Sequence, residues 1–367
     1  MTTPMQDVQK WFAAVTIVLS AGLAPALARD QLGTAGTFRS MGWAACDQGI
    51  PAQFRGACDP GPVDPSLPAV ARSNAEVERA LKLISIVRLE QAREALDSAA
   101  RIDPKNVNAL KLRARLALTE GRAAAEANVN AALLLAPGDS DLLATRAEIL
   151  FSQREFEGAL RDATEALYVN PHNADAFWIR ARILTELDRL EAAENDLTRA
   201  LAIEPDYTRA LALRGEVRLR MTRFAEAGED ASLVLAQSPR NMPALQLRAM
   251  ARTALGKYDD AIEDLTLVLG RPGEPTTAAP AFNVFNEMYI TRAILLVRVG
   301  RDQEALKDLD TIARLGGIRA ILRMQVYLRN NGFPDLTLDG KRSQSFDDAL
   351  KACFVNEACG RGINQRS

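Results

Sequence analysis

Few side chains in this sequence are suited to catalysis or metal binding. The chain has 367 residues and a single histidine, His172. This excludes most Ser/His/Asp and Cys/His catalytic arrangements and most histidine-rich metal sites. The acidic residues form no convergent motif. The sequence therefore predicts a protein that is not an enzyme, with no catalytic residue, no cofactor and no bound metal.

The four cysteines fall in two close pairs, Cys46 with Cys58 and Cys353 with Cys359. Four cysteines allow three pairings. If a long array separates the two ends, pairing between them would violate disulfide geometry, so local pairing is favoured. A zinc site lacks a CxxC spacing and a second histidine, and reactive thiols fit an exported protein less well. We expect two structural disulfides, each within a close pair.

The composition is typical of helical scaffolding rather than an enzyme pocket. Hydrophobic residues make up 48% of the chain, charged residues 25% and aromatic residues 5%. The chain can therefore bury a core. The net charge of -2 gives no basic field, which argues against a nucleic-acid partner.

A repeat in the middle of the chain determines the elements that position these residues. Each proline of a regular series follows a short apolar stretch and should end a helix, because proline lacks an N–H and disfavours helix in the residue before it. Apolar residues spaced three and four apart, on both sides of a central turn, indicate two helices per period. The series recurs every 33 or 34 residues: Pro104, Pro137, Pro171, Pro205 and Pro239.

Small residues recur where two helix axes must approach closely, such as Ala181, Ala193 and Ala200 in the period 174–207. This pattern resembles the tetratricopeptide repeat (TPR), a helix-turn-helix unit of about 34 residues. The match is complete over 140–173, 174–207 and 208–241. Divergent units extend the array over 73–319. The resemblance implies an all-α solenoid of about seven units, wound as a right-handed superhelix.

One charge of each sign recurs in most units beside the packed helix seam, where a charge needs a partner. Arginine occupies a first-helix position that is normally apolar in the family, and aspartate recurs in step on the second helix. We interpret these residues as a ladder of ion pairs that fixes the register of the repeats. The alternative is an anion-binding stripe. The ladder residues are Arg146, Arg180, Arg214, Arg248, Arg292, Asp162, Asp196, Asp230, Asp264 and Asp308, and Arg79 and Arg113 extend the arginine series.

The resemblance further implies that the first helices line a concave groove. There, charges of both signs surround Phe151 and Trp178, which would anchor a peptide or partner segment if they face solvent. Alternatively, these aromatics pack against neighbouring repeats, or the N-terminal segment of the chain occupies the groove. The predicted partner-binding residues are Lys111, Arg115, Glu148, Phe151, Trp178, Arg182, Arg220 and Arg298. Arg115 stands where carboxylate-clamping relatives have asparagine, so that activity is not expected.

A stretch at 270–285 interrupts the array. Pro272, Pro275 and Pro280 predict a loop there rather than a helix. Unit starts at 242 and 286 are 44 residues apart. A loop of this length can be functional or simply tolerated, and it would let the last unit pivot.

The N-terminus has the pattern of an export signal. Lys10 precedes an apolar run that ends near a small-residue triplet at 26–28, as in a cleaved signal peptide over 1–28. The run is short for a membrane span, which needs about 20 residues. The alternatives are an uncleaved anchor and a buried N-terminal helix. We expect a periplasmic protein with no membrane span after cleavage, in which 29–72 forms an irregular segment tied by the first cysteine pair.

Residues 320–367 are predicted to form a C-terminal cap. A helix at Ile321–Leu328 carries Gln325, a turn follows at Asp339-Gly340, and Phe346–Phe354 forms a second helix. This order is similar to the small three-helix peptidoglycan-binding domain, which implies contact with glycan. Several motif residues of that family are replaced here, so a capping or docking role is the alternative.

The sequence thus predicts a non-enzymatic periplasmic TPR scaffold that binds a protein or peptide through its groove. The alternative is a cell-envelope adaptor that contacts peptidoglycan through the C-terminal module.

Overall fold

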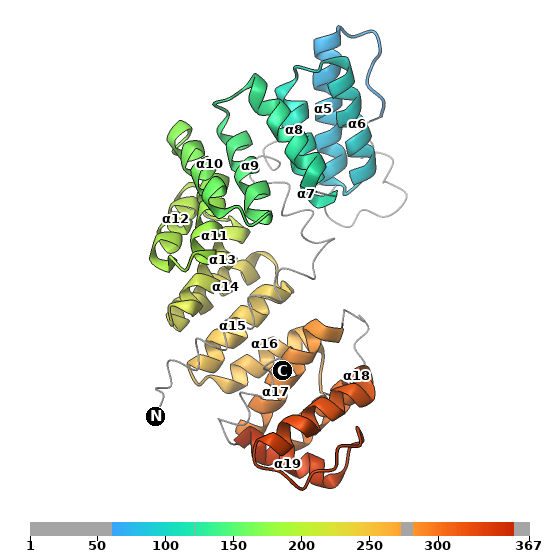
Figure 1. Ribbon diagram of the computed structural model, residues 1–367, viewed down its shortest axis with the longest axis vertical. Helices are drawn as coiled ribbons and strands as arrows, with labels where there is room; N and C mark the ends of the chain where they lie inside the picture. Colours follow the sequence, from blue (N-terminus) through green and yellow to red (C-terminus); the bar gives the residue numbers. More distant parts are fainter. Residues whose placement is uncertain (1–60, 121, 273–281, 356–367) are drawn as a thin grey trace. The chain divides into compact units, whose positions relative to one another are not determined.

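The computed structural model describes residues 61–120, 122–272 and 282–355, and every regular element in these ranges is a helix (Figure 1). The predicted signal peptide, both cysteines of the first pair and Cys359 lie outside the described residues. The all-α architecture predicted from the sequence is confirmed. None of the described helices is both long and apolar enough to cross a membrane.

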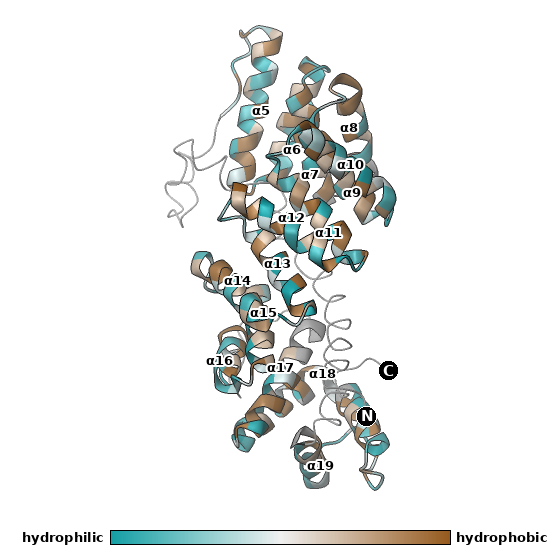
Figure 2. Cartoon of the chain, turned by 90° about the vertical axis from the view of Figure 1, so that its left-hand side faces the viewer, coloured by the Kyte–Doolittle hydropathy of each residue, from teal (hydrophilic) through white to brown (hydrophobic). Residues whose placement is uncertain are grey.

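The chain divides into two compact units, and the boundary between Leu213 and Arg214 falls inside α13 (Thr208–Arg220). In the first unit, consecutive helices pack as pairs, with polar and apolar sides that Figure 2 distinguishes by colour. The pairs are α5 (Ala69–Ser85) with α6 (Leu89–Ile102), α7 (Val107–Glu120) with α8 (Arg122–Leu135), α9 (Ser140–Ser152) with α10 (Phe156–Val169), and α11 (Ala174–Glu186) with α12 (Leu190–Ile203).

The second unit contains the remaining helices. They are α14 (Phe224–Gln237), α15 (Met242–Ala254), α16 (Tyr258–Leu269), α17 (Phe282–Arg298), α18 (Asp302–Asn330) and α19 (Gln344–Val355). One apolar core continues from α15 to α19, and α19 packs on both α17 and α18. The C-terminal segment therefore shares its core with the last repeat.

The ends of the helices follow the proline period. Helices α6, α10 and α12 each end two residues before a proline of the series. Helices α7, α9, α11 and α15 each begin with a side-chain cap that accepts a backbone N–H of the first turn, which satisfies a donor that has no partner within the helix. These capping residues are Asn106, Asp139, Asn173 and Asn241.

A buried polar network recurs between consecutive repeats of the first unit. Asn173 Nδ2 donates to Ser140 Oγ at 2.8 Å, and Ser140 Oγ donates to the Ala166 carbonyl at 2.8 Å. The same arrangement joins Asn106 to Ser73 at 2.9 Å. Each network links three helices through groups that are costly to bury without partners, so it helps fix how one repeat stacks on the next.

Turns between the two helices of one repeat contain one residue with positive φ. Non-glycine residues occupy this position at Val87, Arg154, Asp188 and Thr222, whereas Gly256 and Gly300 occupy it in later units. A side chain disfavours the left-handed region, most strongly when it is branched at Cβ. Thr222, with a φ of 60°, is therefore a strained member of the series.

We expect Thr222→Gly to raise the free energy of unfolding by about 0.5–1 kcal/mol, because glycine removes the left-handed strain at a modest entropic cost. Gly256→Thr is the matched reverse change. A Cβ at Gly256 would meet nothing within 4 Å, so only its φ of 74° opposes a side chain. Thermal melts should move in opposite directions for the two variants, and shifts of the same sign would contradict the strain argument.

Small residues lie at the helix seams, as the sequence predicts. Ala181, Ala193 and Ala200 are completely buried. At Gly215, a Cβ would approach Leu247 Cδ2 to 2.6 Å, so a larger residue at this seam would force the Leu247 side chain to move.

Two predicted boundaries are wrong. Helix α5 begins at Ala69, inside the segment 29–72 predicted to be irregular, and α17 begins at Phe282, inside the predicted loop 270–285. In both places a proline stands one or two residues before the helix. Proline is tolerated there because its missing N–H has no partner in the first turn.

Helix α18 continues across the predicted start of the cap at 320 and is broken only at Gly317, which has φ 58° and ψ −158°. In the cap, Gln325 Nε2 donates to Asp339 Oδ1 at 2.9 Å, and the Gly340 N–H donates to Gln325 Oε1 at 2.9 Å. The glutamine and the turn singled out in the sequence are therefore in direct contact. A Cβ on Gly340 would meet Ile318 Cγ2 at 2.4 Å and the Ile318 carbonyl oxygen at 3.1 Å, and the φ of Gly340 is 65°, so this turn favours glycine.

Candidate functional site

The recurring charges form ion pairs within five of the repeats. In each of these repeats the arginine of the first helix binds the aspartate sixteen residues later through two guanidinium nitrogens. The shortest N–O distances are 2.6 Å for Arg146–Asp162, 2.7 Å for Arg180–Asp196, 2.7 Å for Arg214–Asp230, 2.6 Å for Arg248–Asp264 and 2.6 Å for Arg292–Asp308. The geometry is that of a ladder rather than an anion-binding stripe.

The arginines that precede the five pairs, and two of the pairs themselves, depart from the simple pattern. Before the ladder begins, Arg113 pairs with Asp97 of the preceding repeat at 3.0 Å, and Arg79 pairs with Glu76 of its own helix at 3.4 Å. In the second unit, Arg218 and Arg252 add a second guanidinium to Asp230 and Asp264, at 2.8 and 2.6 Å. The sequence analysis missed these two arginines, although their place four residues after a ladder arginine could have indicated them.

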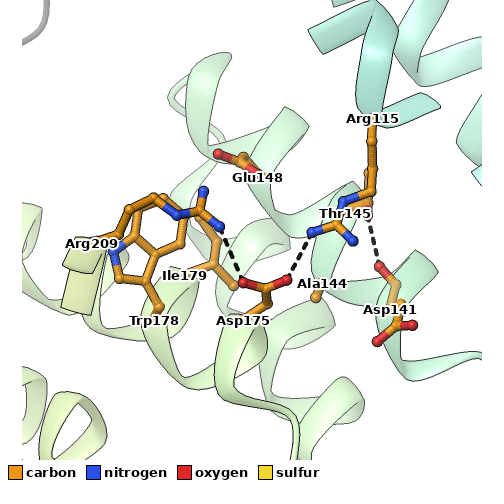
Figure 3. Close-up of a pocket in the computed structure, with 9 residues that line it drawn as sticks. All are labelled: Arg115, Asp141, Ala144, Thr145, Glu148, Asp175, Trp178, Ile179 and Arg209. Carbon is orange, nitrogen blue, oxygen red and sulfur yellow. Dashed lines mark hydrogen bonds and ion pairs between the residues drawn. The ribbon is translucent and has the colours of Figure 1, made fainter. Parts of the chain in front are cut away.

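A pocket of the first unit lies on the first helices of successive repeats (Figure 3). At its centre, Asp175 of α11 accepts hydrogen bonds from Arg115 of α7 at 2.7 Å and from Arg209 of α13 at 3.1 Å. The hydroxyl of Tyr207 also donates to Asp175. The pocket is lined by Arg115, Asp141, Ala144, Thr145, Glu148, Asp175, Trp178, Ile179 and Arg209.

The charges of the pocket are largely compensated from within. Burial alone would raise the pKa of Asp175, but the Arg115 and Arg209 guanidiniums outweigh it and hold that pKa below its usual range. Burial, together with the Asp175 charge, raises the pKa of Tyr207 well above its ordinary value. Asp175 is therefore an ionised acceptor, and Tyr207 is a neutral donor.

Aromatic rings and guanidiniums alternate beside the pocket. Arg182 lies over Phe151 at 4.5 Å and over Trp178 at 4.6 Å, and Arg209 covers Trp178 at 4.2 Å and Tyr207 at 5.3 Å. Such cation–π contacts are stabilising where the cation is partly desolvated. We refer to these five side chains as the ring–guanidinium stack.

Trp178 is only 8% exposed, which supports packing within the repeats over the solvent-facing anchor, the other interpretation of the sequence. The Arg182 and Arg209 guanidiniums both lie over its ring, so it packs within the repeats, as in the alternative interpretation. Trp178 is a structural element of the wall of the pocket rather than an anchor for a partner.

The other predicted groove residues are already engaged with their neighbours. Lys111 pairs with Asp139 at 2.9 Å and Asp141 at 3.0 Å, while Arg182 pairs with Glu148 at 3.2 Å. Arg220 and Arg298 belong to the second unit, where the Arg298 guanidinium lies 5.5 Å from the Tyr258 ring centroid. The structure thus brings Arg115, Glu148 and Trp178 into one pocket.

Sequence analysis missed Asp175, Arg209 and Tyr207, which complete the site. A signal was present for two of them. Asp175 and Asp141 occupy the same register, two residues after a capping residue, and Tyr207 stands where the neighbouring units have asparagine or aspartate.

The remaining chemistry-bearing side chains do not converge. Among the described residues, no group of three or more His, Cys, Asp or Glu side chains could hold a metal ion. His172 lies exposed in the turn before α11. Cys353 is buried in the second unit, but Cys46, Cys58 and Cys359 lie outside the described residues, so the expected pairings stay predictions.

Comparison with known families decides the identity of the array. The family model described as tetratricopeptide repeat matches residues 145–208, which span α10, α11 and α12. These residues are therefore built from tetratricopeptide repeats. Proteins of this type act as protein-interaction scaffolds. No curated protein matches the sequence.

Solved TPR structures resemble the chain at low sequence identity. A tetratricopeptide repeat protein from Parabacteroides merdae is 21% identical with a TM-score of 0.43, and the alignment covers 66% of this chain and 93% of that one. A thermophilic TPR protein in Thermus thermophilus is 26% identical with a TM-score of 0.44, covering 50% and 98%. The first TPR of Spaghetti (RPAP3), bound to an HSP90 peptide, is 26% identical with a TM-score of 0.32, covering 32% and 94%.

Proposed function

We propose that this chain is a non-enzymatic periplasmic TPR scaffold that binds a segment of a partner protein on the first helices of its first unit. The observation that carries the proposal is the pocket of Figure 3, which takes side chains from four successive first helices. Its free volume is about 20 Å³, room for about one or two waters. Small-molecule sites are typically about 300–1,000 Å³, so the pocket suits the tip of one side chain.

The charges of the pocket favour a polar partner segment. Asp141 at the rim is half exposed and can accept a hydrogen bond or an ion pair. Because Asp175 is held by two arginines, a partner would exchange existing ion pairs rather than create new ones. Such contacts contribute more to specificity and association rate than to affinity. The peptide bound by the TPR of Spaghetti illustrates the class of partner.

The proposal is tested with Asp141→Arg, which reverses a charge at the rim without removing a buried group. Glu165→Arg on the exposed side of α10 is the matched control with the same change in net charge. A partner captured from a periplasmic extract and then purified should bind the control like wild type and the Asp141 variant at least about 10-fold more weakly. Equal binding of both variants would place the partner elsewhere.

A second candidate function is that of a cell-envelope adaptor that contacts peptidoglycan. The Gln325 contact with the Asp339-Gly340 turn favours it, because these are the positions through which the segment resembles the peptidoglycan-binding domain. Deleting 320–367 would remove Phe346 and Leu350 from the shared core, so point variants are needed.

Full-length protein should sediment with purified sacculi under this second candidate. Leu338→Asp, at an exposed position beside the turn, should reduce sedimentation, whereas Leu187→Asp in an exposed inter-helix turn should not. Protein that remains in the supernatant would eliminate the adaptor function.

A further inference from the structure

The outward side of α18 after Gly317 carries basic and apolar side chains together with one neutral amide, Asn330. Its members are spaced three or four residues apart, or adjacent, as one helical face requires. We call this set the basic-apolar face, and it consists of Arg319, Leu322, Arg323, Val326 and Arg329. The opposite side of the same helix, with Ile321, Met324 and Leu328, is buried in the core of the second unit.

The side chains of this face are open to solvent. All three arginines are exposed, Leu322 is half-buried and Val326 is 41% exposed. Beside the break in the helix, Ile318 is 68% exposed. Large aliphatic side chains interleaved with arginines are typical of helices that lie in the interface of a membrane.

The positive charge of the face is not compensated within the described part of the chain. No aspartate or glutamate occurs between residues 311 and 334, and none of the three arginines forms an ion pair with a described carboxylate. The neighbouring acids Asp310 and Asp347 both bind Arg342. Arg301 at the start of the same helix differs in this respect, because it binds Glu304 at 2.7 Å.

We propose that the basic-apolar face binds the surface of an anionic lipid bilayer. Guanidinium groups bond phosphates through two parallel N–H donors, and each basic residue near such a surface adds about 1 kcal/mol of attraction. Val326 and Ile318 would enter the boundary between headgroups and acyl chains. An acidic protein would need a matching apolar patch to satisfy both kinds of side chain, whereas any anionic bilayer offers phosphates and acyl chains together. The proposal concerns the second unit and does not depend on the function proposed for the first.

Vesicle sedimentation tests the proposal with full-length protein. The vesicles contain phosphatidylcholine with about a third of phosphatidylglycerol, a composition that gives the negative surface potential needed. We expect Arg319→Glu/Arg323→Glu to weaken binding at least about 30-fold, the change for losing two arginine–phosphate attractions. We expect Val326→Ser to weaken it about 10-fold, because one aliphatic side chain is no longer buried.

Arg101→Glu/Arg240→Glu, at exposed positions of α6 and of the turn before α15, is the control with the same change in net charge, and it should bind like wild type. All variants keep the same N-terminus, so differences between them report on the face alone. Equal binding of wild type and the Arg319/Arg323 variant would overturn the proposal. A loss with that variant but none with Val326→Ser would also overturn it, because the face would then read charge alone, as a site for an acidic protein does.

Discussion

Arg292→Ala should lower the free energy of unfolding of the second unit by about 3–5 kcal/mol, the range for breaking a buried ion pair. Both Arg292 and Asp308 are 0% exposed, so the substitution leaves the Asp308 carboxyl group without its partner in the core. It also removes the bonds from Arg292 to the Thr266 hydroxyl and the Gly270 carbonyl. Urea denaturation followed by circular dichroism measures the change.

Two variants separate this effect from a general loss of side-chain packing. Arg146→Ala removes an equivalent pair whose arginine is 34% exposed, and we expect a cost of about 1 kcal/mol or less. Arg292→Met/Asp308→Leu removes both charges, and most of the lost stability should return, because a buried pair can be replaced by apolar side chains at little cost. A double variant as unstable as Arg292→Ala would show that the charge left unpaired is not the cause.

Asp175→Asn should lower the free energy of unfolding by about 3 kcal/mol at pH 7, the low end of the range for a buried ion pair, because the Asp175 side chain is 22% exposed. The substitution leaves Arg115 and Arg209 facing a neutral amide. Asp141→Asn, whose carboxylate is half exposed, is the control and should cost less than about 1 kcal/mol.

The pH dependence of this effect follows from the pKa of Asp175, which is lower in the folded than in the unfolded state. The stability contributed by the carboxylate is therefore complete above the unfolded pKa of about 3.9 and is lost as the pH falls through the folded pKa. The difference between wild type and Asp175→Asn should shrink as the solution is acidified below about pH 4. A difference that stays constant with pH would mean that the variant acts through packing.

The repeat was predictable from sequence because its signals are local. Prolines and capping residues act on the backbone within a few residues, and the ladder partners lie sixteen residues apart within one unit. The contact of Gln325 with the Asp339-Gly340 turn was indicated in the same way, through residues fourteen and fifteen apart.

The pocket was less predictable because it depends on how consecutive repeats stack on one another. Arg115 and Asp175 are 60 residues apart, and Arg209 reaches Asp175 across 34 residues. No motif spans these distances. Trp178 shows the same difficulty, because its position in the repeat favours exposure and only long side chains from neighbouring positions and units cover it. The helix starts at Ala69 and Phe282 were missed because proline ends one helix and also precedes another.

The ring–guanidinium stack has a mechanical consequence. Arg182 of α11 lies over a ring of α9, and Arg209 of α13 lies over a ring of α11, so each contact crosses from one repeat to the next. Opening the first unit on this side would have to separate both contacts at once. The stack therefore acts as a stiffener that holds this part of the array at one curvature. If a partner docks beside the stack, as we propose, this side of the pocket is already rigid. Little conformational entropy of these side chains would then be lost when the complex forms.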